Sequence, residues 1–368
     1  MKLTHVELHR LKLPLVSPFR TSFGTETRRD VLLIHVIGPD TEGWGECVAD
    51  SDPLYSSEYV DGAQEMVRRF LLPRMPKRVV ASTLAHALAP VRGHWMAKGG
   101  LEAAVLDAEC RLHGQSLADR LGATKSRVPA GVSVGIQDSI PELLDTVGGY
   151  LAEGYVRIKL KIEPGWDIAP VRAVRERFGD EILLQTDANQ AYTLADAAHL
   201  ARLDAFDLLL TEQPLPEDDI AGHAQLAKLV KTPVCLDESI VSARVAAQAI
   251  ALGACRVINI KPGRVGGYLE AVRIHDLCVA NGIAVWCGGM LETGIGRAAN
   301  VALAALPGFT LPGDTSASAR YYHRDVTDPF VLEDGHLRVP TGPGIGVNPL
   351  ADALAEFTVS TETIARTT

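Results

Sequence analysis

The chain has 368 residues, 47% of them hydrophobic, and a formal net charge of −9 at pH 7. Its length suits one large or two ordinary domains with a full hydrophobic core. The excess of acidic residues disfavours a nucleic acid as partner, because a polyanion needs a basic surface. The N-terminus lacks the apolar core of a signal peptide, and no stretch approaches the ~20 uninterrupted apolar residues of a membrane helix. We therefore expect a cytoplasmic protein with neither a nucleic-acid nor a membrane partner.

The six cysteines are scattered along the chain, and no two of them form a C-x-x-C pair. Several lie within apolar runs that are predicted to be strands or helices. We therefore expect buried free thiols in a reducing compartment.

Residues 1–126 have the pattern of an α+β domain. A strand is predicted at 2–14, and a second strand at 31–37 is expected to pair with 43–50 across a turn rich in Gly, Pro and Asp. Helical periodicity then predicts three helices, at 56–72, 81–92 and 96–113.

Residues 127–315 alternate short apolar runs with amphipathic helical segments. From the second run onward, each run ends in a charged residue or, once, a cysteine, and these positions recur every 24–27 residues. One strand plus one crossover helix has this length, and eight such units close into a barrel. A doubly wound sheet is the alternative, but the glycine-rich phosphate loop typical of its first strand is missing here. The eight predicted strands are 132–136, 156–162, 182–188, 207–213, 234–239, 257–262, 285–290 and 309–314.

Residues 316–368 do not continue this period. The segment VLEDGHLRVP and a Pro/Gly-rich stretch predict short strands that pack back on the N-terminal domain. The expected organisation is therefore an N-terminal domain at 1–126, a barrel at 127–315 and a C-terminal segment at 316–368.

Three acidic residues follow consecutive predicted strands. Asp187, Glu212 and Asp237 end the third, fourth and fifth strands. The C-terminal ends of barrel strands meet at one pocket, where three carboxylates repel one another unless a cation lies between them. Oxygen ligands select a hard ion such as Mg²⁺. The alternative is that each acid caps the next helix or pairs with a basic residue.

Three lysines accompany these acids. In YVRIKLKIEP (155–164), Lys159 and Lys161 share one face of the second strand, and Lys261 ends the sixth strand. A lone lysine at a strand end is usually solvated, but this set around three acids favours a pocket. The ordinary lysine pKa of ~10.4 is too high for a base at neutral pH. We expect a divalent cation and the neighbouring ammonium groups to lower it into the working range.

The pattern K-x-K, D-x-N, E-Q-P, D-E-S and K-P-G resembles the enolase superfamily, and within it the muconate-lactonizing subgroup. Five further segments are similar to the N-succinylamino acid racemase (N-acylamino acid racemase) and o-succinylbenzoate synthase family, and together they span nearly the whole chain. They are SPFRTSFGT (17–25), GWGEC (43–47), KPGRVGGY (261–268), GGMLETGIGRAAN (288–300) and LPGDTSAS (311–318).

This resemblance implies an α/β fold, a (β/α)₇β modified TIM barrel under an N-terminal capping domain that the C-terminal segment completes. It implies Mg²⁺, replaceable by Mn²⁺ or Co²⁺, on the three acids, and a small-molecule carboxylate as substrate. Lys161 and Lys261 would exchange protons on opposite faces of the substrate α-carbon, and Lys159 would assist electrostatically. The implied assembly is a homo-oligomer, from dimer to octamer.

The implied reaction is racemization of N-succinyl amino acids through an enediolate, together with o-succinylbenzoate synthase activity. A dedicated synthase of menaquinone biosynthesis is the alternative, in which Lys161 alone serves as base and then acid. Two further alternatives do not use the three acids: a metal-free barrel aldolase with Lys159 or Lys261 as Schiff-base lysine, and a non-catalytic binding protein.

Other residues are expected near the substrate. Arg264 follows Lys261 by three residues and would adjust its pKa, or pair with a loop carboxylate. Asp314 would hold a substrate group or orient a lysine, and Asp314-Thr315-Ser316 replaces the D-x-D expected of a dipeptide epimerase. The aromatic residues are alternatively core residues, and the glycine turn alternatively closes the barrel. Asn189 and Glu238 are expected behind the ligands, with a role in strand-end hydrogen bonding as the alternative. The remaining candidates are Phe19, Phe23 and Tyr55 from the cap, and Ser133, Gly289 and Met290 at strand ends.

Overall fold

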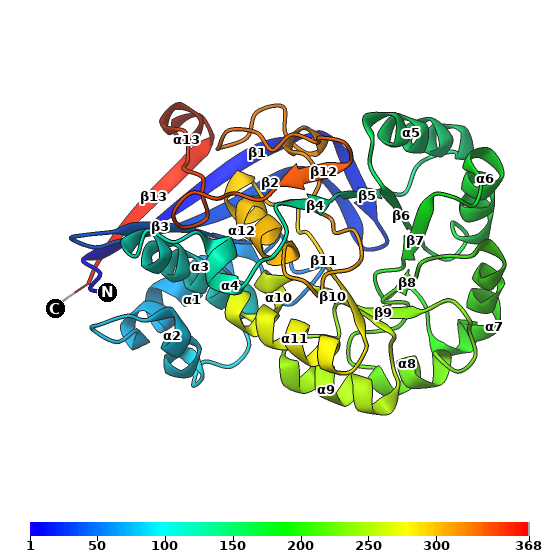
Figure 1. The fold of residues 1–368 in the computed structure, drawn as a ribbon, viewed down its shortest axis with the longest axis horizontal. Helices are drawn as coiled ribbons and strands as arrows, with labels where there is room; N and C mark the ends of the chain where they lie inside the picture. The colour runs from blue at the N-terminus through cyan, green and yellow to red at the C-terminus, as the bar shows by residue number, and fades with distance from the viewer. Residues whose placement is uncertain (367–368) are drawn as a thin grey trace.

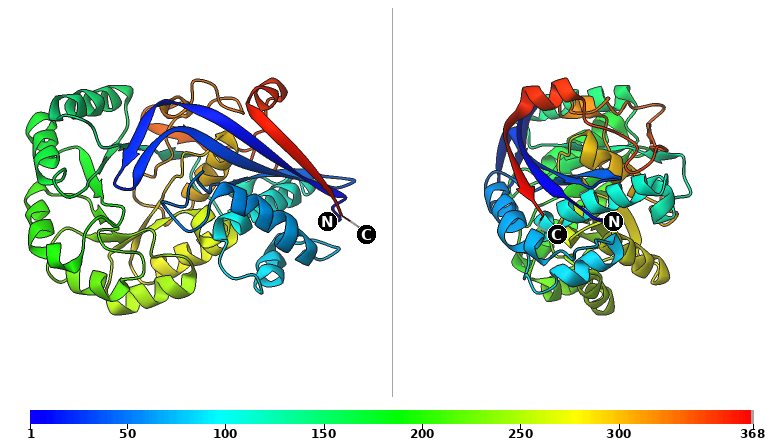
Figure 2. Two further views of the ribbon diagram at one scale, coloured as in Figure 1. Left: turned by 180° about the vertical axis from the view of Figure 1, so that it is seen from behind. Right: turned by 90° about the vertical axis from the view of Figure 1, so that its left-hand side faces the viewer.

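The computed structural model describes residues 1–366, in which an antiparallel sheet lies beside a curved parallel sheet (Figure 1). The antiparallel sheet has the strand order β13-β1-β2-β3. Its strands are β1 (His5–Thr21), β2 (Gly24–Ile37), β3 (Glu42–Cys47) and β13 (Thr358–Ala365). The last strand pairs with the first, so the start of β1 and the end of β13 lie together at the far end of this sheet (Figure 2).

The strands β1 and β2 are much longer than the sequence predicted. They continue through the polar segment 15–30 as a hairpin, with an irregular register between Pro14 and Phe19. This segment lacks the apolar alternation of a half-buried strand, so its sequence does not reveal the pairing. Figure 2 shows the hairpin extending toward the barrel. At its tip, the Ser22 hydroxyl donates to the Asn189 carbonyl at 3.3 Å.

Helices cover one face of the antiparallel sheet, and the longest of them is almost wholly buried. The long helix α3 packs directly on β3, where glycines at positions 43 and 45 let the two backbones approach closely. The helices of this part are α1 (Val60–Met66), α2 (Ala81–Leu88), α3 (Trp95–Leu112) and α4 (Leu117–Leu121), and a π-helical turn (Val67–Leu71) continues α1.

Seven parallel strands follow one another in chain order around the second sheet, which confirms the predicted α/β barrel fold. Each neighbouring pair is parallel, as βαβ units require. The strands are β5 (Gly131–Val134), β6 (Arg157–Lys161), β7 (Leu183–Asp187), β8 (Thr211–Glu212), β9 (Val234–Leu236), β10 (Val257–Ile260) and β11 (Ala284–Cys287).

The eighth predicted strand, 309–314, is not a regular strand but still closes the ring. Phe309 forms an isolated parallel bridge with Val285 in β11, and Gly313 forms another with Ala130 beside β5. Pro312 interrupts the ladder between them, because proline has no N–H to donate.

Helices form an arc around the outside of the parallel sheet (Figure 1). Most begin at a Ser, Thr or Asp whose side chain accepts a backbone N–H, such as Ser139 before α5 and Thr293 before α12. The helices are α5 (Ile140–Glu153), α6 (Ile168–Phe178), α7 (Ala197–Leu200), α8 (Ile220–Leu226), α9 (Ala243–Leu252), α10 (Pro262–Val265), α11 (Tyr268–Ala280) and α12 (Gly294–Ala304).

Two buried carboxylates join the N-terminal part to the barrel helices. Glu46 of β3 accepts from the backbone N–H of Gly296 at 3.0 Å, at the start of α12. Glu102 of α3 accepts from the backbone N–H of Tyr268 at 2.9 Å, at the start of α11. Burial raises the pKa of both carboxyl groups to about 7. Acceptors of this kind satisfy the free N–H groups of a helix N-terminus. The two contacts therefore attach α12 to β3 and α11 to α3.

The C-terminal segment packs in two places. β13 lies on the antiparallel sheet, preceded by α13 (Ala351–Phe357). β12 (His336–Arg338) instead pairs antiparallel with β4 (Arg127–Pro129). The expectation that all short C-terminal strands join the N-terminal domain is therefore wrong for β12. A turn at Asp334-Gly335 places Leu337 opposite Val128, where both side chains are buried.

Two expectations from composition concern the described residues 1–366. No helix among them is long and apolar enough to cross a membrane. All six cysteines are free and buried, as predicted.

A first prediction tests the contact between α3 and β3. A side chain at Gly45 would overlap the carbonyl oxygen of Gly100 and the backbone nitrogen of Ala104. We expect Gly45→Ala to lower the free energy of unfolding by about 2–4 kcal/mol, because two backbones would have to separate. Urea denaturation measures this change.

The matched control is Gly149→Ala in α5, where an added Cβ meets no atom within 4 Å. This substitution should raise the free energy of unfolding by ~0.5–1 kcal/mol, because it restricts the unfolded chain. Equal effects of the two substitutions would contradict the proposed packing.

Candidate active site

The predicted acids and lysines meet at the C-terminal ends of the parallel strands. β6 carries Lys159 and Lys161, and Asp187 lies directly opposite Lys161 on β7. Glu212 lies opposite Asp187 on β8. Because residues in register point the same way, three consecutive strands place their functional groups on one rim of the barrel.

Asp187, Glu212 and Asp237 are 0–1% exposed, and the first two share a lysine partner. The Lys159 ammonium lies 3.3 Å from Asp187 Oδ2 and 3.1 Å from Glu212 Oε2. Burial raises the pKa of Glu212 well above its usual value, and the Asp187 charge raises it further. Burial acts in the same direction on Asp187, but Lys161 and Lys159 outweigh it and hold that pKa below its usual value.

The donor set fits a divalent metal ion. Glu238 Oε2 is buried without a hydrogen-bond donor, and Asp237 Oδ1 accepts no hydrogen bond and has only the Arg264 guanidinium at ion-pair distance, 3.3 Å. Buried carboxylate oxygens normally have a donor or a cation as partner. All-oxygen ligands favour hard cations such as Mg²⁺. The acids that would hold such an ion are those predicted, on β7, on β8 and just after β9.

Two lysines reach the acids from opposite sides. The Lys161 ammonium donates to Asp187 Oδ2 and Asn189 Oδ1, both at 2.6 Å. The Lys261 ammonium follows β10 and donates to Asp237 Oδ2 at 2.7 Å. Three strands, β7, β8 and β9, separate the two lysines around the ring.

The charges of the protein itself do not lower the pKa values of Lys159 and Lys261. Burial disfavours the charged form, but the carboxylates around Lys159 and Lys261 outweigh it, so both pKa values lie above the usual value. The lowering that the sequence led us to expect therefore requires the additional positive charge of a bound metal ion. A lowered lysine pKa in the metal-bound protein stays a prediction.

A buried pair links β6 to the segment that closes the barrel. Arg157 is fully buried and donates to Asp314 Oδ1 at 2.8 Å and to the Pro312 carbonyl at 3.0 Å. The other oxygen of Asp314 accepts from Lys159 at 2.6 Å. The Trp286 ring lies 4.7 Å from the Lys159 ammonium and 5.1 Å from the Arg157 guanidinium. Arg157 thus belongs to the barrel structure, and its role was missed from the sequence.

Most of the remaining candidates line one cavity above the acids. The structure brings them together with the three lysines, and the cap residues approach from β1, β2 and the loop after β3. The lining residues that we predicted are Phe19, Phe23, Tyr55, Ser133, Asn189, Gly289, Met290 and Asp314. Phe19, Tyr55 and Met290 are also buried, so the alternative of a core role applies to them as well.

Two of the candidates lie behind this cavity. Arg264 donates to the Asp237 carbonyl at 2.9 Å and forms an ion pair with Asp237 Oδ1 at 3.3 Å. It therefore pairs with the carboxylate that also accepts from Lys261, and an effect on the Lys261 pKa stays a prediction. Glu238 Oε1 accepts from Asn189 at 2.9 Å. Burial, followed by the charge of Asp237, raises the Glu238 pKa to about 7.

The sequence missed several residues of the cavity. Glu26 of β2 and Asp50 after β3 line it and both pair with the buried Arg29. Burial raises the pKa of Glu26. None of these residues ends a barrel strand, so strand periodicity carries no signal for them. Tyr321, from the C-terminal segment, also lines the cavity.

Comparison with known proteins identifies the family. Residues 142–353 match the family "Enolase C-terminal domain-like", and residues 4–122 match "Mandelate racemase / muconate lactonizing enzyme, N-terminal domain". The chain belongs to the enolase superfamily. Members of this superfamily use a divalent metal ion, which agrees with the donor set above.

Relatives with known names match over nearly the whole chain. An N-succinylamino acid racemase from Amycolatopsis sp is 65% identical over 362 residues, 98% of each chain. An o-succinylbenzoate synthase from Geobacillus kaustophilus is 49% identical over 351 residues, 94% of this chain and 93% of that one. A crystal structure of an enolase-superfamily protein from Listeria innocua superposes with a TM-score of 0.95, at 41% identity and 99% coverage of both chains. The predicted family and fold are thereby confirmed.

A second prediction tests the buried Arg157–Asp314 pair. We expect Arg157→Met to lower the free energy of unfolding by about 3–5 kcal/mol, because breaking a buried ion pair leaves charge uncompensated. Urea denaturation of the purified variant measures the loss. The control is Arg28→Met, at an exposed arginine of β2, for which a change within about 0.5 kcal/mol is expected. A loss at Arg157 no larger than that of the control would show that the pair contributes little.

Proposed function

We propose that the enzyme racemizes N-acyl amino acids, N-succinyl derivatives in particular, by moving the α-proton between two lysines. One observation carries the proposal: Lys161 and Lys261 approach from opposite sides of the ring, and the three acids lie at the ends of the strands between them. The names of the relatives support the substrate class.

The chemistry explains why these residue types are needed. Removing the α-proton of a carboxylate creates a doubly negative enediolate, which is unstable in an apolar pocket. A Mg²⁺ ion, or Mn²⁺ or Co²⁺ in its place, held by Asp187, Glu212 and Asp237 would supply the positive charge that stabilises it. The Lys159 ammonium, fixed by Asp314, adds charge beside the same acids.

The two lysines then divide the proton transfer. One lysine, in its neutral form, removes the α-proton from its face of the substrate. The other, as an ammonium group, delivers a proton to the opposite face, and the configuration inverts. For the reverse direction the two exchange roles. Tyr55 contacts the Lys261 ammonium at 3.0 Å and thereby orients it toward the cavity.

The same residues support a second activity. In o-succinylbenzoate synthesis, Lys161 would act alone as base and then as acid, and Lys261 would be a cation near the ring of the substrate. The relatives carry both names, so we propose this dehydration as an additional activity, with a dedicated synthase of menaquinone biosynthesis as the alternative.

Three features of the protein as a whole stay predictions. We propose a homo-oligomer between dimer and octamer, a cytoplasmic location, and a division of the chain into 1–126, 127–315 and 316–368.

A third prediction concerns the metal ion. Asp237→Asn should lower Mg²⁺ affinity and racemase activity together while leaving the fold intact, because a neutral amide removes one of three charges on the cation. Calorimetric titration measures the Mg²⁺ affinity, a turnover assay measures the racemase activity, and circular dichroism checks the fold. Asp218→Asn, at an exposed acid of the neighbouring loop, is the control and should change none of the three. EDTA should abolish activity, whereas a metal-free Schiff-base lyase would keep it.

A fourth prediction separates the two bases by exchange of the α-proton of an N-succinyl amino acid in deuterium oxide. Lys261→Ala should abolish racemization and leave exchange for one enantiomer, and Lys161→Ala should spare the other. By analogy with mandelate-type relatives, Lys161 serves the S enantiomer. Each lost reaction should slow by ~10²–10⁴-fold, the usual contribution of a general base.

The control for this experiment is Lys228→Ala, at an exposed lysine after α8, which should exchange both enantiomers at the wild-type rate. Equally fast exchange of both enantiomers in either single variant would exclude the two-base mechanism. A one-base synthase would then be the better account.

A further inference from the structure

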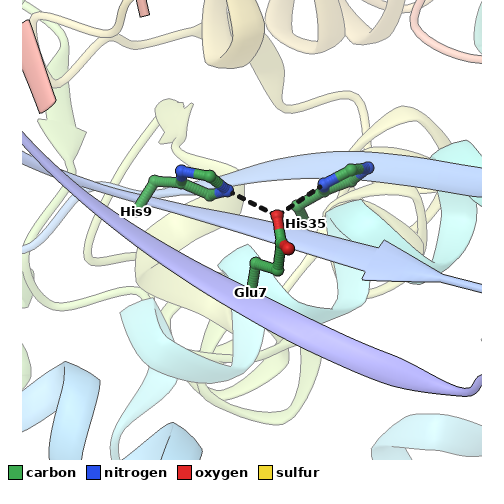
Figure 3. A group of neighbouring side chains, drawn as sticks. All are labelled: Glu7, His9 and His35. Carbon is green, nitrogen blue, oxygen red and sulfur yellow. Dashed lines mark hydrogen bonds and ion pairs between the residues drawn. The ribbon is translucent and has the colours of Figure 1, made fainter. Parts of the chain in front are cut away.

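A cluster of two histidines and a glutamate lies on the antiparallel sheet, outside the active site (Figure 3). Glu7 and His9 share one face of β1, and His35 of β2 lies directly opposite Glu7. Eleven residues lie between His9 and Thr21, where β1 ends. We propose that Glu7, His9 and His35 bind a transition-metal ion of the Zn²⁺ class, independently of the active-site metal.

The spacing of the donor atoms matches a tetrahedral site. His9 Nε2 lies 3.0 Å from Glu7 Oε2, and His35 Nδ1 lies 3.4 Å from the same oxygen. The three donor atoms all lie within 4.8 Å of one another. In a tetrahedral zinc site with bonds of ~2.0–2.1 Å, neighbouring ligand atoms are about 3.3 Å apart. Small side-chain adjustments therefore suffice to place an ion between them, with solvent at the fourth position next to the partly exposed Glu7.

The far nitrogen of each histidine also has an oxygen partner. His35 Nε2 lies 3.3 Å from Glu42 Oε2, and His9 Nδ1 lies 3.2 Å from Thr361 Oγ1. Metal-binding histidines typically engage an oxygen through the ring nitrogen that does not bind the metal, which orients the ring. The Trp44 ring stacks on His35 with centroids 3.9 Å apart and fixes its plane further.

The surroundings of His35 are compatible with a metal ligand. Both nitrogens of His35 face carboxylate oxygens, Glu7 on one side and Glu42 on the other. A neutral imidazole has a single N–H and can donate to only one of them, so both contacts require either an imidazolium or a cation on one side. A metal ion between Nδ1 and Glu7 satisfies the second contact and leaves the Nε2–H for Glu42. Imidazole with one carboxylate selects Zn²⁺ and related borderline ions rather than Mg²⁺.

The experiment uses the full-length protein, stripped with a chelator and then saturated with excess Mg²⁺. Co²⁺ is added as a spectroscopic probe, because four-coordinate Co²⁺ absorbs visible light much more strongly than six-coordinate Co²⁺ at an all-oxygen site. We expect such bands at one equivalent per chain, and we expect added Zn²⁺ to displace them. Their absence in the wild-type protein would overturn the proposal.

Variants then test the three ligands. Glu7→Gln, His9→Gln and His35→Gln should each weaken Zn²⁺ binding at least tenfold, and Glu42→Gln about tenfold through the His35 ring. His86→Gln, at an exposed histidine of α2, is the control and should bind like the wild type. Bands that persist in the three ligand variants would place the ion elsewhere. His9→Gln should keep wild-type racemase activity in Mg²⁺, because the site is separate from the catalytic one.

X-ray absorption of the Zn²⁺-loaded wild-type protein gives a readout that does not depend on any variant folding. Two imidazole ligands in the first shell of the zinc are expected. A shell of oxygen ligands without imidazole would overturn the proposal.

Discussion

The buried charges at the C-terminal ends of the barrel strands must balance one another, and this requirement constrains the arrangement of the site. The three lysines and the three predicted metal-binding acids are at most 7% exposed. Removing such ions from water costs several kcal/mol each unless opposite charges lie beside them. The contacts meet this requirement in pairs: Lys161 with Asp187, Lys261 with Asp237, and Lys159 with Glu212. Loss of either member of a pair leaves a buried charge, so the acids and lysines depend on one another.

The same oxygens have two possible partners, which connects metal binding to proton transfer. Asp187 Oδ2 accepts from Lys161, and Asp237 Oδ2 accepts from Lys261. In the proposed function these carboxylates hold Mg²⁺, so metal and lysine compete for them. If Lys261 gives up its carboxylate contact, it loses the interaction that keeps its pKa high. The charge pattern that stabilises the metal-free protein is thus the one that metal binding would convert into an acid–base pair.

The sequence predicted the strand-end residues well because a barrel repeats. Lys161, Asp187, Glu212, Asp237 and Lys261 recur at the length of one βα unit, so spacing alone places them on one rim. The eighth strand obeys the same period, although Pro312 reduces it to two isolated bridges. These features follow from the regular spacing of strands and helices along the chain, which can be read from a single sequence.

Contacts between distant segments carried no such signal. Arg157 pairs with Asp314, 157 residues later, a contact that strand periodicity does not indicate. Glu26 and Asp50 meet at the cavity through Arg29, and none of them lies at the end of a barrel strand. The cluster of Glu7, His9 and His35 depends on the register of β1 with β2. Register and side-chain pairing depend on packing, so they emerged only with the fold.

The surroundings of Asp314 bear on the substrate. Sequence analysis left two roles for this residue. One of its oxygens accepts from Arg157 and the other accepts from Lys159, which is the contact that the lysine-orienting role requires. Two residues later, Ser316 is fully buried and its hydroxyl donates to the Gly131 carbonyl at 3.0 Å. A dipeptide epimerase would be expected to have a second carboxylate at that position. With serine there and Asp314 already paired, this strand end offers no free carboxylate for a substrate ammonium group, which agrees with a substrate whose amino group is acylated.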